Sequence, residues 1–139
     1  MEARTVDYSR TTITELMIPS FANFSGKVHG GILLSLMDKV AYVCASKHSG
    51  AYGVTVSVDG VEFKEPVEVG ELASLYASIN YVGNSSMIVG VRVVSLKPKT
   101  GDEKPTNSCY FTMVAKDEEG ALMTHPRSTL EDEDDDIRY

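Results

Sequence analysis

The sequence has no tryptophan, only two cysteines, no long apolar run and no excess of basic residues. Nowhere do 18 or more apolar residues follow one another, so no membrane-spanning helix is predicted. Met1 to Thr5 lack the basic and then apolar layout of a signal peptide. Cys44 and Cys109 are too few for a disulfide framework. Together these absences predict a cytoplasmic protein without a membrane partner.

Acidic charge is concentrated at the end of the chain. The formal net charge is -7 over 139 residues, but residues 131–139 carry six acids and one base. The rest of the chain is therefore nearly neutral and has no basic stripe, which argues against nucleic acid as a partner. Adjacent like charges repel one another and resist burial, so residues 126–139 are predicted to form an acidic, disordered tail. Residues 1–125 suit a single domain.

The pattern of apolar residues predicts one strand followed by one long helix. Residues 10–18 are rich in β-branched residues and predict a strand that Pro19 ends. Residues 30–47 are apolar in nearly every direction around a helix, and a helix of this kind is normally buried.

The remaining sequence predicts four further strands. A phase shift at Asp59–Gly60 within the first of them indicates a β-bulge. We therefore predict an α+β fold in which an antiparallel sheet of five or six strands wraps a long central helix. The four predicted strands cover residues 52–65, 71–82, 86–97 and 106–116.

Asp38 is the one carboxylate in the predicted helix. It follows Gly31 by seven residues, which is about two helical turns, so the two residues lie on one face. An unpaired carboxylate is costly to bury. Asp38 therefore either serves as a general base or faces solvent or a partner chain, and the composition of the helix leaves both interpretations open.

Gly30 and Gly31 begin the predicted helix, where backbone N–H groups are unpaired and the helix dipole is positive. Without side chains in the way, a ligand oxygen can reach these N–H groups, as an oxyanion hole requires. The same glycines would also suit a tight entry from loop to helix. His29 could act as an acid–base group, or it could cap or pack the helix. His48 and His125 have no partners at ligand spacing, so no metal site is predicted.

A longer motif runs through the loop and the helix, Asn23-x-x-Gly26-x-x-His29-Gly30-Gly31-x-x-Leu34-x-x-x-Asp38. Three further segments follow in order at residues 54–63, 66–71 and 83–87. Together they resemble the signature of hotdog-fold acyl-CoA hydrolases, such as bacterial short-chain acyl-CoA thioesterases and the repeated domains of the brain-type acyl-CoA hydrolase. The likeness covers roughly residues 10 to 125.

This resemblance implies a hotdog fold and hydrolysis of acyl-CoA thioesters to free CoA and a carboxylic acid. No cofactor is implied, because CoA is part of the substrate. The family pattern implies a homodimer with shared active sites, further assembled as a trimer of dimers, in which Asn23 of one chain faces Asp38 of the other. The Gly31 N–H would bind the thioester oxygen, and Asp38 would act as general base or nucleophile. Contacts with CoA are implied at Gly30, His29, Thr55, Val56, Ser57, Ser85 and Ser86.

Two other functions stay open at this level. A hotdog dehydratase acting on 3-hydroxyacyl thioesters would need His29 as its base, and the helix lacks the Glu-x-x-Ala-Gln pattern of such enzymes. A non-catalytic acyl-CoA sensor would need no base, whereas Asn23 and Asp38 are both present. The chain has no Gly-x-Ser-x-Gly elbow, so a serine-triad esterase finds no support.

Overall fold

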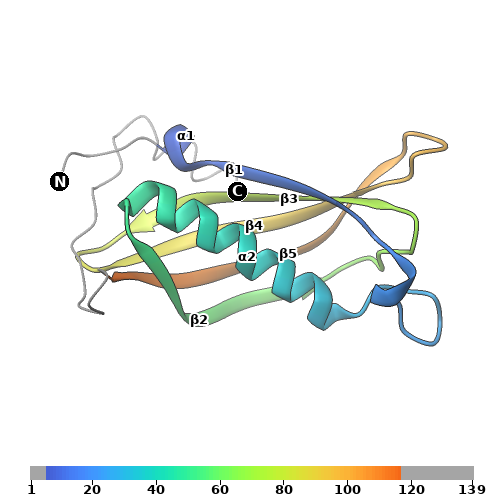
Figure 1. Cartoon of the computed structure of the whole chain (residues 1–139), viewed down its shortest axis with the longest axis horizontal. Coiled ribbons are helices and arrows are strands. Elements are labelled where there is room, and N and C mark those ends of the chain that lie inside the picture. Colours follow the sequence, from blue (N-terminus) through green and yellow to red (C-terminus); the bar gives the residue numbers. More distant parts are fainter. Residues whose placement is uncertain (1–5, 117–139) are drawn as a thin grey trace.

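The computed structural model describes residues 6–116, in which one long helix lies across one face of an antiparallel sheet (Figure 1). The long helix, α2, spans Gly30–Ser49, and a short helix, α1, spans Val6–Ser9. A single 3-10 turn, η1, spans Pro19–Phe21. The strands are β1 (Thr11–Leu16), β2 (Tyr52–Phe63), β3 (Leu72–Val82), β4 (Ser86–Leu96) and β5 (Glu103–Lys116).

The predicted α+β class is confirmed, and the described sheet has five strands in the order β1-β3-β4-β5-β2. Every neighbouring pair of strands is antiparallel. The order of the strands places β1 and β2 at the two edges of the sheet. The core fills the space between α2 and the sheet, with Met37 of the helix and Leu75, Ile79 and Phe111 of the strands almost fully buried. The predicted tail, residues 126–139, and the last part of the predicted domain lie outside the described residues.

Strand β5 begins three residues earlier than predicted, and it contains Pro105. A proline removes a backbone donor and is tolerated in sheets at edges or bulges. Pro105 meets both conditions, because Thr106 is skipped in the register with β4 and the pairing with β2 stops at Asn107. The predicted bulge at Asp59–Gly60 is confirmed by a register shift and by a positive φ of 60° at Gly60.

The expectation that the sheet buries the whole helix is wrong for the single chain. Met37 and Val40 are fully buried against the sheet. All five strands of the sheet contact α2, but the side of the helix turned away from the sheet stays exposed. We call this side the open face of α2, and it carries Gly31, Ser35, Asp38 and Tyr42.

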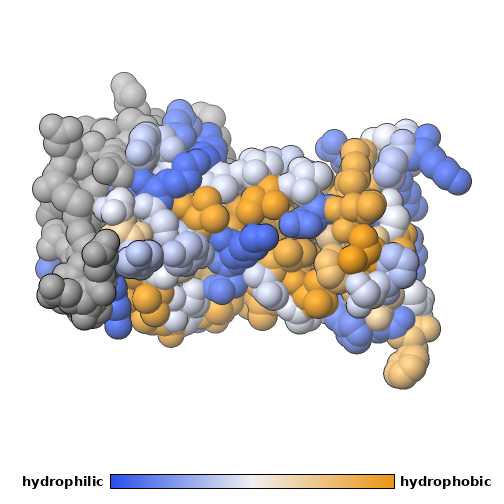
Figure 2. All heavy atoms as spheres, viewed as in Figure 1, coloured by the Kyte–Doolittle hydropathy of each residue, from blue (hydrophilic) through white to orange (hydrophobic). Residues whose placement is uncertain are grey.

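Strand β2 is a long edge strand with exposed apolar side chains. It covers 12 residues and, within residues 6–116, pairs only with β5, so its other edge has no strand partner among these residues. Figure 2 shows hydrophobic surface along the helix and towards the edge formed by β2. The exposed apolar residues of β2 and its start are Tyr52, Val54, Val56, Val58, Val61 and Phe63. Such an edge is a ready site for pairing with another chain.

Candidate active site

Asp38 is held in place by a threonine from the neighbouring strand. The Thr55 hydroxyl on β2 donates a hydrogen bond to Asp38 Oδ1 over 2.7 Å. The bond fixes one carboxylate oxygen of Asp38, whose side chain lies exposed on the open face. A hydrogen bond to a charged acceptor is stronger than one between neutral groups. The arrangement therefore presents a positioned carboxylate on the side of the helix that the described residues leave uncovered.

The beginning of α2 is accessible, as an oxyanion hole requires. The N–H groups of Ile32 and Leu33 both donate to the His29 carbonyl, at 3.1 and 3.3 Å. No backbone carbonyl in residues 6–116 accepts from the N–H of Gly30 or Gly31. A Cβ atom at Gly31 would meet no other atom within 4 Å, so open space lies in front of that residue. A carbonyl oxygen could occupy it and accept from the helix end.

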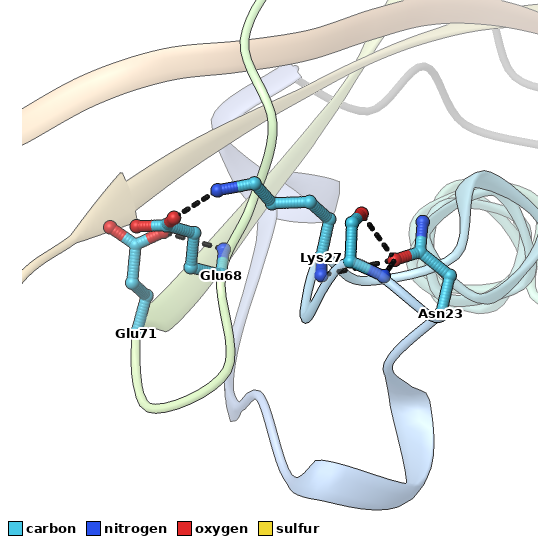
Figure 3. A network of polar contacts seen from close by, with 5 residues as sticks. Asn23, Lys27, Glu68 and Glu71 are labelled. Atoms are coloured by element: carbon cyan, nitrogen blue, oxygen red, sulfur yellow. Dashed lines mark hydrogen bonds and ion pairs between the residues drawn. The ribbon is translucent and has the colours of Figure 1, made fainter.

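Asn23 shapes the loop that leads into α2. Its side-chain oxygen accepts from the backbone N–H of Ser25 and Lys27 at 2.9 and 3.2 Å, and from the Ser25 hydroxyl at 2.8 Å. Because backbone N–H groups can only donate, the side-chain atom that faces them must be the oxygen. Figure 3 shows the side-chain nitrogen directed away from the loop. The side-chain NH2 group of Asn23 can therefore donate a hydrogen bond to an oxygen of a ligand.

An ion pair anchors this loop to the segment before β3 (Figure 3). Lys27 pairs with Glu68, and the Val28 N–H donates to the Val67 carbonyl over 2.8 Å. The hydrogen bond from Lys27 and its positive charge lower the pKa of the Glu68 carboxyl. The buried Glu71 accepts from the Glu68 N–H over 2.7 Å and holds that segment in turn. The anchored loop fixes the position of Asn23 next to the helix end.

Other residues implied in CoA contact lie far from this helix end within the chain. Ser85 and Ser86 belong to the β3–β4 hairpin, whose strand β4 pairs at Met87 with Met113 near the start of β2. That hairpin lies at the C-terminal end of α2, and a 20-residue helix is roughly 30 Å long. Within one chain these two serines therefore lie about a helix length away from Gly31.

Val56 and Ser57 follow Thr55 on the edge strand and are both exposed. The register of β2 against β5 shifts between Thr55 and Ser57, so Val56 is a bulged residue without a partner in β5. His29 is exposed and makes no capping hydrogen bond with its side chain. His29 therefore caps α2 through its backbone carbonyl alone, and an acid–base role of its side chain stays a prediction.

Both cysteines are free and buried in the core. Burial raises the pKa of the Cys44 thiol to about 12. Burial likewise raises the pKa of Cys109 to about 12, and the negative charge of Asp38 adds to the effect. Within residues 6–116 no group of three or more histidine, cysteine or acidic side chains could hold a metal ion. No helix in that range is long and apolar enough to cross a bilayer.

The contact between Thr55 and Asp38 could not be found from sequence spacing. It joins a helix to a strand across a turn, so neither the helical nor the strand repeat relates the two residues. Asn107 was also missed, although it lies on β5 in a pocket next to Asn23 and Gly30. Asn107 could have been found in the sequence as a polar residue at a position where the alternation of the strand predicts an inward-facing side chain.

The architecture is that of the hotdog fold, and it is shared with solved acyl-CoA hydrolases. A hexameric acyl-CoA thioesterase superposes with a TM-score of 0.92 at 34% identity, over 99% of this chain and 90% of that one. An acyl-CoA hydrolase from Staphylococcus aureus was solved with butyryl coenzyme A, coenzyme A and coenzyme A disulfide. It superposes with a TM-score of 0.87 at 29% identity, over 91% of this chain and 77% of that one. Variants of the S. aureus enzyme with an asparagine, an aspartate or a threonine replaced by alanine have similar structures.

Sequence comparison leads to the family. Residues 25–101 match the model of the thioesterase superfamily. Protein VdlD of Helicobacter pylori is 52% identical over 111 residues, which are 80% of this chain and 64% of VdlD. The cytosolic acyl coenzyme A thioester hydrolase of mouse is 32% identical over 140 residues, 99% of this chain and 37% of the mouse protein. The chain thus belongs to the thioesterase superfamily, and it spans less than two thirds of the length of these two relatives.

Proposed function

We propose that the chain hydrolyses acyl-CoA thioesters to free CoA and a carboxylic acid. The observation that carries this proposal is the Thr55–Asp38 hydrogen bond on the open face of α2, which positions a carboxylate for chemistry. The replaced asparagine and aspartate of the S. aureus hydrolase lie fifteen positions apart, and its replaced threonine follows seventeen positions later. Asn23, Asp38 and Thr55 have the same two separations.

The site requires two chains. Asp38 lies about two turns beyond Gly31, roughly 10 Å along the helix axis. An attacking group must approach within about 3 Å of a carbonyl that is bound at the helix end. Asp38 of the same chain is too far away for this. We therefore infer that Gly31 and Asn23 of one chain face Asp38 of its partner subunit.

Strand β2 supports this assembly. Pairing of two β2 edges would join the sheets, satisfy the unpaired backbone groups and bring the two open faces of α2 together. The exposed apolar residues of β2 would then be covered. The hexameric state of the similar thioesterase supports further association into a trimer of dimers.

In the proposed reaction the thioester oxygen accepts from the Gly31 N–H and from the side-chain NH2 group of Asn23. Asp38 of the partner subunit acts in one of two ways. As a general base it takes a proton from a water that attacks the carbonyl carbon, and as a nucleophile it forms an anhydride that water then cleaves. In both routes the C–S bond breaks and the CoA sulfur leaves as a thiolate that takes up a proton.

Contacts of CoA with Gly30, His29, Thr55, Val56, Ser57, Ser85 and Ser86 are part of this proposal. In the proposed assembly Ser85 and Ser86 come from a different chain than Gly31, because they lie at opposite ends of α2 within one chain. We propose a cytoplasmic location, in keeping with the free thiols and with the mouse relative, which is named as cytosolic.

Mixing of two inactive variants tests the function and the shared site together. Asn23→Ala and Asp38→Asn chains are each expected to release almost no thiol from acyl-CoA. After the two are unfolded and refolded together, half of the dimers are mixed, and each mixed dimer holds one intact site and one doubly altered site. About a quarter of the wild-type thiol release should return. No recovery would contradict the shared site, and no thiol release by the wild type would contradict the function.

The same assay separates the alternatives on this fold. Free thiol indicates a hydrolase, gain or loss of the enoyl thioester absorbance without free thiol indicates a dehydratase, and binding without turnover indicates a sensor.

A further inference from the structure

A pocket of about 460 Å³ lies at the N-terminal end of α2, within the size range of small-molecule sites. Gly30 lines one side of it, and Phe63 at the end of β2 stands over that glycine, with its ring 3.3 Å from the position of a Cβ there. Val28, Leu33 and Val67 supply apolar walls. The pocket therefore adjoins the helix end where the proposed thioester carbonyl binds.

Asn107 of β5 also lines the pocket, and its side chain is only 4% exposed. Side chains alternate along a strand, so Asn107 faces the same side as the buried Cys109 and Phe111, towards α2. Neither Oδ1 nor Nδ2 of Asn107 has a hydrogen-bond partner within the described part of the chain. Buried amides are nearly always paired, because an unpaired donor and acceptor lose their hydration without compensation.

The charged residues that line the pocket indicate which kind of ligand group could hydrogen-bond to Asn107. Lys27 is already paired with Glu68, and Lys64 lies 3.3 Å from Glu62. Glu65 adds a negative charge at the rim. These pairings disfavour a phosphate or a carboxylate as the occupant. Asn107 offers one donor group and one acceptor, and a neutral hydroxyl group can satisfy both at once.

We propose that this pocket receives the acyl group of the substrate and that Asn107 selects acyl groups that carry a hydroxyl. The hydroxyl donates to Oδ1 and accepts from Nδ2, while the rest of the acyl chain contacts Val28, Leu33 and Phe63. This inference rests on the proposed thioesterase function and adds a substrate class to it. A site that hydrogen-bonds a substrate hydroxyl discriminates against the analogue without it, because the buried polar groups are then left unpaired.

The test compares butanoyl-CoA with 2-hydroxybutanoyl-CoA and 3-hydroxybutanoyl-CoA by thiol release. The wild type should have a higher kcat/KM for at least one hydroxyacyl-CoA than for butanoyl-CoA. Asn107→Leu keeps the shape of the side chain and removes its hydrogen-bonding atoms. It should lower the ratio of the two kcat/KM values about tenfold or more, chiefly by reducing turnover of the hydroxyacyl substrate.

Asn80→Leu is the matched control. Asn80 also has a buried side-chain oxygen without a partner, but it packs against Gly90 and does not line the pocket. Its substitution should leave the ratio unchanged. Equal kcat/KM for plain and hydroxylated substrates in the wild type would overturn this inference alone, even if Asn107→Leu fails to fold. An unchanged ratio in a folded Asn107→Leu would do the same, and hydrolysis of none of the three would overturn the proposed function as well.

Discussion

The two ends of α2 differ in almost every physical respect. The C-terminal end is closed, since His48 and Ser49 are buried and Gly50 adopts a left-handed conformation, with its N–H donating to the Ser46 carbonyl. The N-terminal end is open, with Gly30 and Gly31 exposed and their N–H groups without a backbone acceptor in the described chain. One end of the helix completes the fold, whereas the other keeps donors available that folding alone would have used. The comparison supports the proposal that the chemistry takes place at the open end and on the face that continues from it.

The largest expected effect follows from removing the charge on the open face. Asp38→Asn keeps the shape of the side chain and an oxygen for the Thr55 hydroxyl, but it cannot act as base or nucleophile. Turnover of acyl-CoA should fall about a thousandfold, with binding of CoA and thermal stability little changed. Thiol-release kinetics, CoA titration and a melting curve measure the three properties. Asp59→Asn, the same change on exposed β2, is the control, and a wild-type rate in Asp38→Asn would rule out the proposed mechanism.

The second prediction compares a glycine-to-alanine substitution at the N-terminal end of α2 with one at its C-terminal end. Gly31→Ala places a methyl group in open space, so it should stabilise the helix by up to about 1 kcal/mol while hindering the substrate oxygen and lowering kcat about a hundredfold. Gly50→Ala forces alanine to a φ of 72° and should cost about 1 kcal/mol of unfolding free energy, with unchanged kcat/KM. Denaturant unfolding measures the change in stability of each variant, and steady-state kinetics measure the change in activity. Equal losses of stability and activity in the two variants would remove the distinction between the ends.

The smallest of these effects concerns the orientation of Asp38. Thr55→Val is nearly isosteric and removes the hydrogen bond to Asp38 Oδ1, which is worth about 1.5–3 kcal/mol for a charged acceptor. Because about 1.4 kcal/mol corresponds to a factor of ten in rate, kcat should fall at least about tenfold. KM should stay near its wild-type value if Thr55 only positions the carboxylate. A rise in KM with unchanged kcat would mean that Thr55 acts only through its proposed contact with CoA and does not position the carboxylate. Thr55→Ser, which keeps the hydroxyl, should restore most of the rate.

The sequence predicted the elements of the fold well, because each has a strong local signal. Pro19 marks the end of β1, the apolar run from Gly30 marks α2, and Gly60 marks the bulge of β2. Degree of burial was harder to predict. An apolar helix gives no indication of whether its own sheet or another chain covers it, so the exposure of Asp38 and Tyr42 became visible only in the structure.

Residues of the candidate site were predictable where they lie within one local motif. The spacing of Gly31 and Asp38 placed both on one face of the helix, and the family motif that runs through the loop and the helix added Asn23. The pairing of Asp38 with Thr55, and the position of Asn107 beside Gly30, depend on how β2 and β5 register under the helix. That register follows from the pairing of strands distant in sequence, which residue types alone do not define.

The exposed edge of β2 has a consequence for the amount of working protein in solution. Each proposed site takes residues from two chains, so a lone folded chain carries two incomplete halves. Below the dissociation constant of the pair, the number of complete sites rises with the square of the chain concentration. Doubling the protein would then quadruple the activity, so that strand β2 makes catalysis sensitive to the amount of protein present.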